Sequence, residues 1–126
     1  MAAAAFGLGL EHVVDAYGCD EAALRSQIVL QRLLSRIIED LHLRVIGDPA
    51  WHVFPEPAGL TGLVMLTESH LSVHTFPESQ YAAMNLYCCR QTAEWSWQAS
   101  IKEILGARDV VVRTIRRGVS LPVEAV

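Results

Sequence analysis

The chain has 126 residues, of which 52% are hydrophobic, and a formal net charge of −4. A chain of this length and composition can bury a core of its own, so disorder is excluded and we expect a single domain spanning residues 1–126. Because the balance is acidic and Lys and Arg form no long run, neither a nucleic acid nor an anionic membrane is expected as a partner.

The cysteines and the hydrophobic runs indicate the cellular compartment in which this chain is expected. An odd number of cysteines that includes an adjacent pair (Cys19, Cys88 and Cys89) is a poor disulfide framework. No segment approaches the roughly 20 apolar residues that a membrane-spanning helix needs. The opening run MAAAAFGLGLEH lacks the basic region of a signal peptide. We therefore expect a reduced, soluble, cytoplasmic protein.

The first half of the chain predicts a strand, a long helix and a second strand. HVVDAY (residues 12–17) has the short apolar pattern of a strand, and so does GLVMLTE (62–68). Between them, residues 19–43 predict one helix that begins at Asp20, a good N-cap. Its apolar residues recur at three- and four-residue steps on one face: Leu24, Ile28, Val29, Leu33, Ile37, Ile38 and Leu41.

The second half predicts two alternating strands, a helix and a last strand. In HLSVHTF (70–76), Leu71 and Val73 share one face, while the two histidines and Ser72 share the other. YAAMNLYCC (81–89) alternates likewise, with Cys88 on the core face and Asn85 and Cys89 on a half-polar face. TAEWSWQASIKEILG (92–106) reads as a helix ending at Gly106, and DVVVRTIRR (109–117) as the last strand.

The order strand, helix, three strands, helix, strand predicts the fold class. Short connections between successive strands favour antiparallel pairing, and two amphipathic helices need one sheet face to pack on. We expect an α+β two-layer sandwich, a mainly antiparallel sheet with both helices on one face. The other face, only partly hydrophobic, would meet solvent, a ligand or a second subunit.

The segment LTESHLSVHTFPE (66–78) contains a possible metal site and a possible hydrolase site. His70 and His74 are four residues apart, which on a strand separates them by about 13 Å, too far for one zinc ion. No metal site is expected. Ser69 and His74 could be a nucleophile and a base, but no G-x-S-x-G elbow surrounds the serine and no acid is placed to orient the histidine. On residue patterns alone, a strand with ordinary surface histidines is the simplest interpretation.

A resemblance to a known family changes this interpretation. The segment ESHLSVHTFPE (68–78) closely resembles the processing-site segment of the prokaryotic S-adenosylmethionine decarboxylases, small pyruvoyl-dependent enzymes that cleave themselves. EHVVDAYGCD resembles the family's N-terminal strand, TGLVMLTESH the strand that leads into the cut, and YAAMNLYCC the strand that carries a catalytic cysteine. The resemblance covers most of the chain.

The resemblance implies a cut between Glu68 and Ser69, giving chains of residues 1–68 and 69–126. In this chemistry the serine hydroxyl attacks the preceding carbonyl, and loss of the serine α-proton then breaks the resulting ester. The dehydroalanine that forms is hydrolysed to a pyruvoyl group with release of ammonia. His74 matches the family's processing histidine, a suitable proton acceptor near pH 7. Thr61 lies where the family often has a serine that supports processing.

The resemblance also assigns the decarboxylation of S-adenosylmethionine to this chain. A pyruvoyl group derived from Ser69 would form a Schiff base with the substrate amine and act as the electron sink. Cys89 matches the proton donor, Glu78 the residue that binds the ribose, and Phe54 the aromatic residue that stacks on adenine. The product would supply aminopropyl groups for spermidine synthesis. A homodimer of cleaved protomers is also implied, in which one subunit could complete the pocket of the other.

Three departures from the family pattern leave the substrate open. Asn85 stands where aspartate is common, Cys88–Cys89–Arg90 replaces Thr-Cys-Gly, and Phe76 replaces a frequent tryptophan or tyrosine. One alternative is therefore a pyruvoyl-dependent decarboxylase of a free amino acid, such as arginine or ornithine. Another is an uncleaved paralogue that binds or regulates without catalysis.

Overall fold

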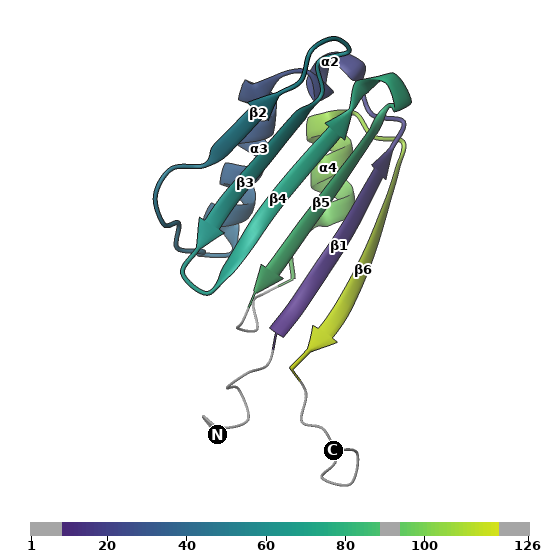
Figure 1. The fold of residues 1–126 in the computed structure, drawn as a ribbon. Helices are drawn as coiled ribbons and strands as arrows, with labels where there is room; N and C mark the ends of the chain where they lie inside the picture. The colour runs from purple at the N-terminus through teal and green to yellow at the C-terminus, as the bar shows by residue number, and fades with distance from the viewer. Residues whose placement is uncertain (1–8, 89–93, 119–126) are drawn as a thin grey trace, which may run out of the picture.

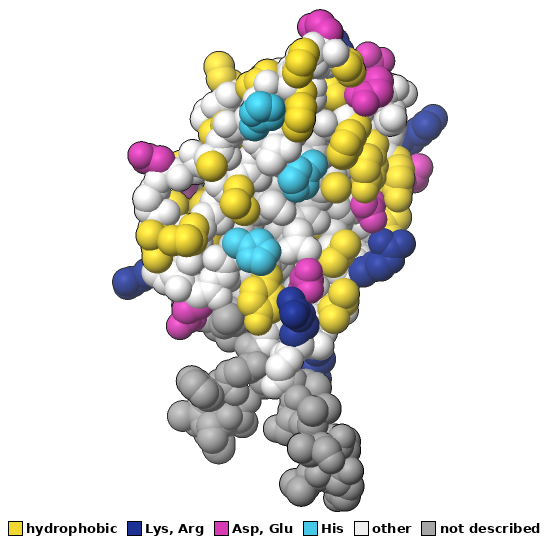
Figure 2. Space-filling model, in the orientation of Figure 1, with side chains coloured by type: hydrophobic (Ala, Val, Ile, Leu, Met, Phe, Trp, Pro, Cys, Tyr) yellow, Lys and Arg dark blue, Asp and Glu magenta, His cyan; other side chains and the backbone are white. Residues whose placement is uncertain are grey.

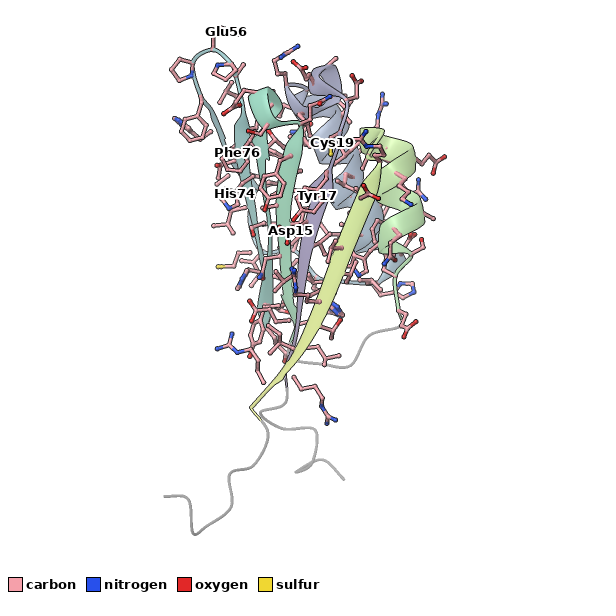
Figure 3. The ribbon with its side chains drawn as sticks, turned by 90° about the vertical axis from the view of Figure 1, so that its right-hand side faces the viewer. Asp15, Tyr17, Cys19, Glu56, His74 and Phe76 are labelled. Carbon is pink, nitrogen blue, oxygen red and sulfur yellow. The ribbon has the colours of Figure 1, made fainter. Side chains whose placement is uncertain are left out.

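The computed structural model describes residues 9–88 and 94–118. They form one six-stranded sheet in the order β2-β3-β4-β5-β1-β6, antiparallel throughout (Figure 1). The helices cover one face of this sheet, and we call the other the open face (Figure 3). The strands are β1 (Gly9–Tyr17), β2 (Ala50–Val53), β3 (Leu60–Leu66), β4 (Ser69–Phe76), β5 (Tyr81–Cys88) and β6 (Asp109–Arg117). The helices are α2 (Glu21–Leu24), α3 (Gln27–Asp40), α4 (Trp97–Leu105) and the 3₁₀ turn η1 (Pro77–Ser79). The predicted α+β sandwich is confirmed.

Strand alternation places the core between the sheet and the helices. Leu71 and Val73 of β4 are fully buried, as predicted, and so is the predicted core face of β5, where Cys88 is 2% exposed. The helices contribute the other side of this core. The largest buried side chains include Leu24, Leu30, Leu33, Ile37, Leu60, Leu71, Leu86, Ile101 and Leu105. One apolar layer thus fixes β3, β4 and β5, the strands that carry most of the predicted site.

The long helix predicted for residues 19–43 is wrong in one respect, because the chain forms two helices there. Ser26 leaves the helical conformation, with φ −100° and ψ 108°, and its hydroxyl accepts the N–H of Val29 at 3.2 Å. It therefore caps a new helix, α3. Asp20 precedes α2 but makes no side-chain cap. Within α3, Ile28 is nine residues before the buried Ile37 and therefore on the opposite side of the helix. Ile28, which the sequence assigned to the apolar face, is 64% exposed.

The sequence also failed to predict β2, a four-residue strand at the sheet edge. Most of its side chains are exposed, so no alternation marks it in the sequence. Its register is set by Trp51, whose ring covers Gly62 so closely that a Cβ there would lie 2.5 Å from it. Because β2 leads into the loop before β3, it positions Phe54.

The predicted end of the second helix is confirmed. Gly106 ends α4 with a left-handed φ of 66°.

The open face is partly apolar and its charges are paired (Figure 2). Glu11 and Asp15 of β1 lie there, and each contacts an arginine of β6: Arg117 at 3.4 Å and Arg113 at 3.0 Å. Around these pairs the face exposes large hydrophobic side chains: Tyr17, Leu63, Met65, Phe76, Val111 and Ile115. Such a surface suits association better than full solvation.

Within the described ranges, no helix is long and apolar enough to cross a membrane. Cys19 and Cys88 are buried and carry free thiols, and burial raises the pKa of Cys19 to about 11. Cys19 is therefore a packing residue at neutral pH.

Candidate functional site

The Glu68–Ser69 bond lies at the tip of a hairpin. β3 ends at Leu66, β4 begins at Ser69, and the two residues between them form a tight turn. A backbone bond from Thr67 N–H to the Arg44 carbonyl, at 3.0 Å, holds this turn from outside the hairpin. A cut here would leave the β3–β4 ladder and its neighbours paired, so the two products would remain one folded body. Ser69 is the first residue of β4 and directly follows this turn.

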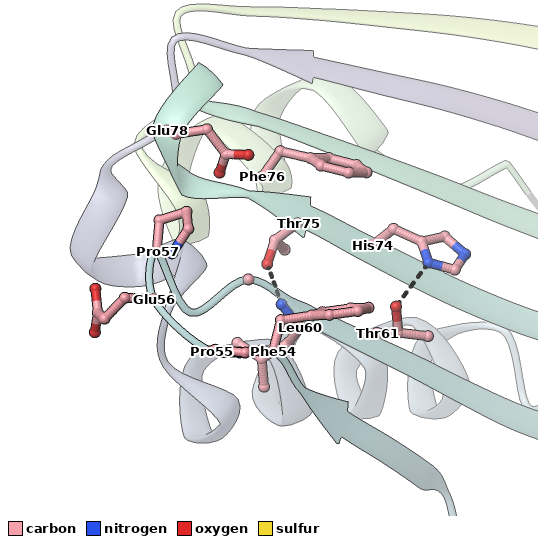
Figure 4. A pocket seen from close by; sticks show the side chains of 11 residues that line it. Phe54, Pro55, Glu56, Pro57, Leu60, Thr61, His74, Thr75, Phe76 and Glu78 are labelled. Atoms are coloured by element: carbon pink, nitrogen blue, oxygen red, sulfur yellow. Dashed lines mark hydrogen bonds between the residues drawn. The ribbon is translucent and has the colours of Figure 1, made fainter.

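A pocket of about 450 Å³ lies at the opposite end of the same strands (Figure 4). We call it the His74 pocket. Four predicted site residues line it: Phe54, Thr61, His74 and Glu78. Thr61 and His74 are opposite each other on β3 and β4, and the Thr61 Oγ1 and His74 Nδ1 atoms are 3.0 Å apart. The two residues that the resemblance relates separately to processing are thus in direct contact.

A buried hydroxyl fixes the wall of the His74 pocket. Thr75 Oγ1 accepts the Leu60 N–H at 2.9 Å and donates to the Leu24 carbonyl at 2.8 Å, which ties β3 and β4 to the end of α2. Gly59 passes so close that a Cβ would lie 2.3 Å from the Thr75 carbonyl oxygen. A side chain at Gly59 would therefore displace the loop that carries Phe54.

Phe76 and Glu56 are among the lining residues that were not predicted as site residues. Phe76 follows His74 by two positions on the same face of β4, so alternation could have placed it there. Its ring and that of Phe54 lie on either side of the pocket (Figure 4). Glu56 belongs to the loop between β2 and β3, and its carboxylate is directed away from His74 in the same view. No sequence pattern marks it.

Ser69 and His74 are not brought together within the chain. They are the first and sixth residues of β4, so about 17 Å of extended strand separates them. Alternation also sends the two side chains towards opposite faces. β5 ends beside Ser69, because its Tyr87 is paired with His70. Cys89 and Arg90 lie outside the described residues. The predicted site is therefore divided between the two ends of the sheet.

Asn85 lies in neither half of the site. It lies on β5 between Ser72 and Val13, in the middle of the open face. Its amide donates to Glu11 at 2.8 Å, and its Oδ1 atom is buried without a hydrogen bond from any described residue. Among the described residues, no three potential metal-binding side chains gather as a metal site would require.

Comparison with known proteins identifies the family. A family model described as S-adenosylmethionine decarboxylase matches residues 10–118. The chain belongs to the S-adenosylmethionine decarboxylase family. Members of this family are pyruvoyl-dependent, with the pyruvoyl group formed from an internal serine. The predicted family and cofactor class are thus confirmed.

Relatives and a solved structure agree with this assignment. The chain is 33% identical over 116 residues to an S-adenosylmethionine decarboxylase proenzyme of Caldicellulosiruptor saccharolyticus, covering 88% of this chain and 89% of the relative. It is 32% identical over 113 residues to the proenzyme of Methanococcus maripaludis, covering 89% and 91%. The crystal structure of the adenosylmethionine decarboxylase of Aquifex aeolicus superposes with a TM-score of 0.72 at 27% identity, covering 92% of this chain and 95% of that one. These findings do not favour the free amino acid decarboxylase or the uncleaved paralogue.

Proposed function

We propose that this chain cleaves itself between Glu68 and Ser69 and then decarboxylates S-adenosylmethionine. One observation carries the proposal: the hydroxyl-bearing Ser69 directly follows a tight turn, while His74, Thr61, Phe54 and Glu78 share one pocket. The product would be an aminopropyl donor for spermidine synthesis. Free arginine or ornithine has no adenine ring for the aromatic walls to hold, which favours the nucleoside substrate.

In the processing step, Ser69 Oγ attacks the Glu68 carbonyl carbon, and the peptide bond to the Ser69 nitrogen is replaced by an ester. Removal of the Ser69 α-proton then expels the Glu68 carboxylate. His74 is the proposed base for that proton. When His74 Nδ1 donates to Thr61 Oγ1, the Nε2 atom is left with a free lone pair to accept it. In this tautomer, the contact with Thr61 orients the imidazole and leaves Nε2 available as the base.

In the decarboxylation step, the chain's residues bind and orient the substrate. Phe54 and Phe76 hold the adenine between their rings, and the Glu78 carboxylate accepts hydrogen bonds from the ribose hydroxyls. The pyruvoyl group supplies an electron sink for the carboxylate that leaves as carbon dioxide. Cys89 then returns a proton to the α-carbon. The partly apolar walls of the pocket limit the water that could compete for that carbon.

A two-fold dimer would join the two halves of the site. If two open faces stack with their strands antiparallel and the axis near the middle of β4, the Ser69 end of one protomer lies over the His74 pocket of its partner. Stacked sheets lie about 10 Å apart, which is less than the roughly 17 Å between these residues within one strand. The exposed hydrophobic side chains of the open face, its paired charges and the buried acceptor Asn85 Oδ1 support this arrangement.

Intact-mass measurement and a carbon dioxide assay test the proposed function. The purified chain should separate into residues 1–68 and a pyruvoyl-blocked 69–126, and should release carbon dioxide from carboxyl-labelled S-adenosylmethionine but not from arginine or ornithine. Ser69→Ala should stay uncut and inactive. Ser72→Ala, a matched serine on the same strand, should be cut normally. A wild-type chain that remains full length after prolonged incubation would contradict the proposal. Release of carbon dioxide from arginine or ornithine, and none from S-adenosylmethionine, would show that the proposed substrate is wrong.

A further inference from the structure

Three aromatic residues form a row across the open face next to the His74 pocket. Phe76 of β4 is opposite Tyr81 of β5, and Tyr81 is opposite Tyr17 of β1. The Phe76 and Tyr81 ring centroids are 5.6 Å apart with 22° between the planes, and those of Tyr81 and Tyr17 are 5.5 Å apart with 29°. We call these residues the aromatic row. Its first member lines the pocket, so the row extends from the pocket along the same end of the sheet to β1 (Figure 3).

Tyr81, the middle residue of the row, is anchored by a charged pair. Its hydroxyl donates to Asp15 Oδ1, and Asp15 Oδ2 accepts a hydrogen bond from Arg113 at 3.0 Å. The Asp15 side chain is only 17% exposed, so this contact is largely shielded from water. The hydrogen bond to Asp15, with burial, raises the pKa of Tyr81 to about 12. The hydroxyl is therefore protonated, and able to donate, throughout the neutral range.

Phe76 needs such a support. Its side chain is 42% exposed, and an exposed ring on two rotatable bonds loses conformational freedom when it is held against a ligand. The Tyr81 ring stacks against Phe76 and restricts those rotations before any ligand arrives. A wall that is already in place costs less to order on binding than a mobile one.

We propose that Tyr81 is a positioning residue for substrate binding, because it holds Phe76 in place as the second aromatic wall of the His74 pocket. Asp15, fixed by Arg113, holds Tyr81 in turn. This inference rests on the proposed function, since it takes an adenine nucleoside as the group that Phe54 and Phe76 enclose. It assigns to β1 and β6, which do not line the pocket, a part in substrate affinity.

The test measures binding without turnover, in the uncut Ser69→Ala chain. Calorimetry with S-adenosylmethionine should show that Tyr81→Leu weakens binding about two- to tenfold, the range expected for loss of one aromatic pair. Tyr81→Phe keeps the ring but loses the hydrogen bond to Asp15, so it should weaken binding measurably but less than Tyr81→Leu. In the self-processed enzyme with Ser69 intact, Tyr81→Leu should raise KM by the same factor and leave kcat nearly unchanged.

Ile28→Ala is the control, because Ile28 is an exposed apolar side chain of α3 that does not line the His74 pocket. It should bind like the parent. Independently of any ligand, ¹³C relaxation of the Phe76 ring should show greater motion in Tyr81→Leu. The inference alone would be overturned if Tyr81→Leu bound like the parent, if Ile28→Ala weakened binding equally, or if the motion of the Phe76 ring were unchanged. A Ser69→Ala parent that does not bind S-adenosylmethionine would contradict the proposed function and the inference with it.

Discussion

Asn85 lies in the middle of the open face, where its amide donates to Glu11 at 2.8 Å and Glu11 also contacts Arg117 at 3.4 Å. Its sequence departure from the family therefore affects the charge of this face and not the lining of the His74 pocket. With asparagine here, the two carboxylates of β1 balance the two arginines of β6. At the scale of the residue, Asn85 is thus a feature of the open face that lies outside the His74 pocket.

Asn85→Asp should make stability depend on pH. It places a second carboxylate within hydrogen-bond distance of Glu11, and mutual repulsion raises the folded-state pKa of the pair above its unfolded values. A raised carboxyl pKa means that stability is lost as pH increases. The deficit against wild type should be small near pH 4 and reach about 1–2 kcal/mol above the raised pKa.

Urea denaturation from pH 4 to pH 8, at one protein concentration, measures this deficit. Glu11→Gln combined with Asn85→Asp removes the repulsion and should recover wild-type stability. A single Asn85→Asp variant whose deficit is constant over this range would show that the two carboxylates do not interact.

At the scale of the element, the sequence predicts strands better than helix boundaries here. Alternation in residues 70–76 and 81–88 placed both faces of β4 and β5 correctly, because a period of two leaves one assignment once a core face is chosen. The helix break was missed because Ser26 is compatible with a helix interior, and only the packing of α2 beside η1 selects the cap. β2 was missed because a short, exposed edge strand needs little apolar alternation.

Ser26→Ala tests whether the cap stabilises the break between α2 and α3. Loss of the hydroxyl leaves the Val29 N–H without its acceptor, so the free energy of unfolding should fall by about 1 kcal/mol. Ser35→Ala is the matched control, an exposed serine inside α3, and should be neutral or slightly stabilising. Urea denaturation of both variants gives the comparison. Equal stability changes in the two variants would mean that the Ser26 hydroxyl contributes nothing as a cap.

At the scale of the whole molecule, the resemblance named residues that the fold gathers in one pocket, but it did not indicate how the proposed site is distributed over the sheet. Phe54, Thr61, His74 and Glu78 were named separately from the sequence, and the fold brings all four to one pocket. Ser69 and His74 were named from a single motif, and the extended strand between them separates the two residues in space. Phe76 was noted only as a departure from the family's tryptophan or tyrosine. Its place opposite Phe54 depends on the loop before β3, which the sequence pattern does not show. The sequence does not show how far apart the two ends of the sheet lie. In the proposed dimer, a second copy of the chain brings the Ser69 end close to a His74 pocket.

Complementation between two inactive chains tests the central claim that one protomer's Ser69 is processed beside its partner's His74. A tagged His74→Ala chain and an untagged Ser69→Ala chain are co-expressed, and the intact masses of both are measured after purification. We predict that the His74→Ala chain, uncut when expressed alone, is cut between Glu68 and Ser69 in the mixture, and that the Ser69→Ala chain stays whole. If the His74→Ala chain cleaves when expressed alone, or remains full length in a mixture that contains mixed dimers, the shared site is contradicted.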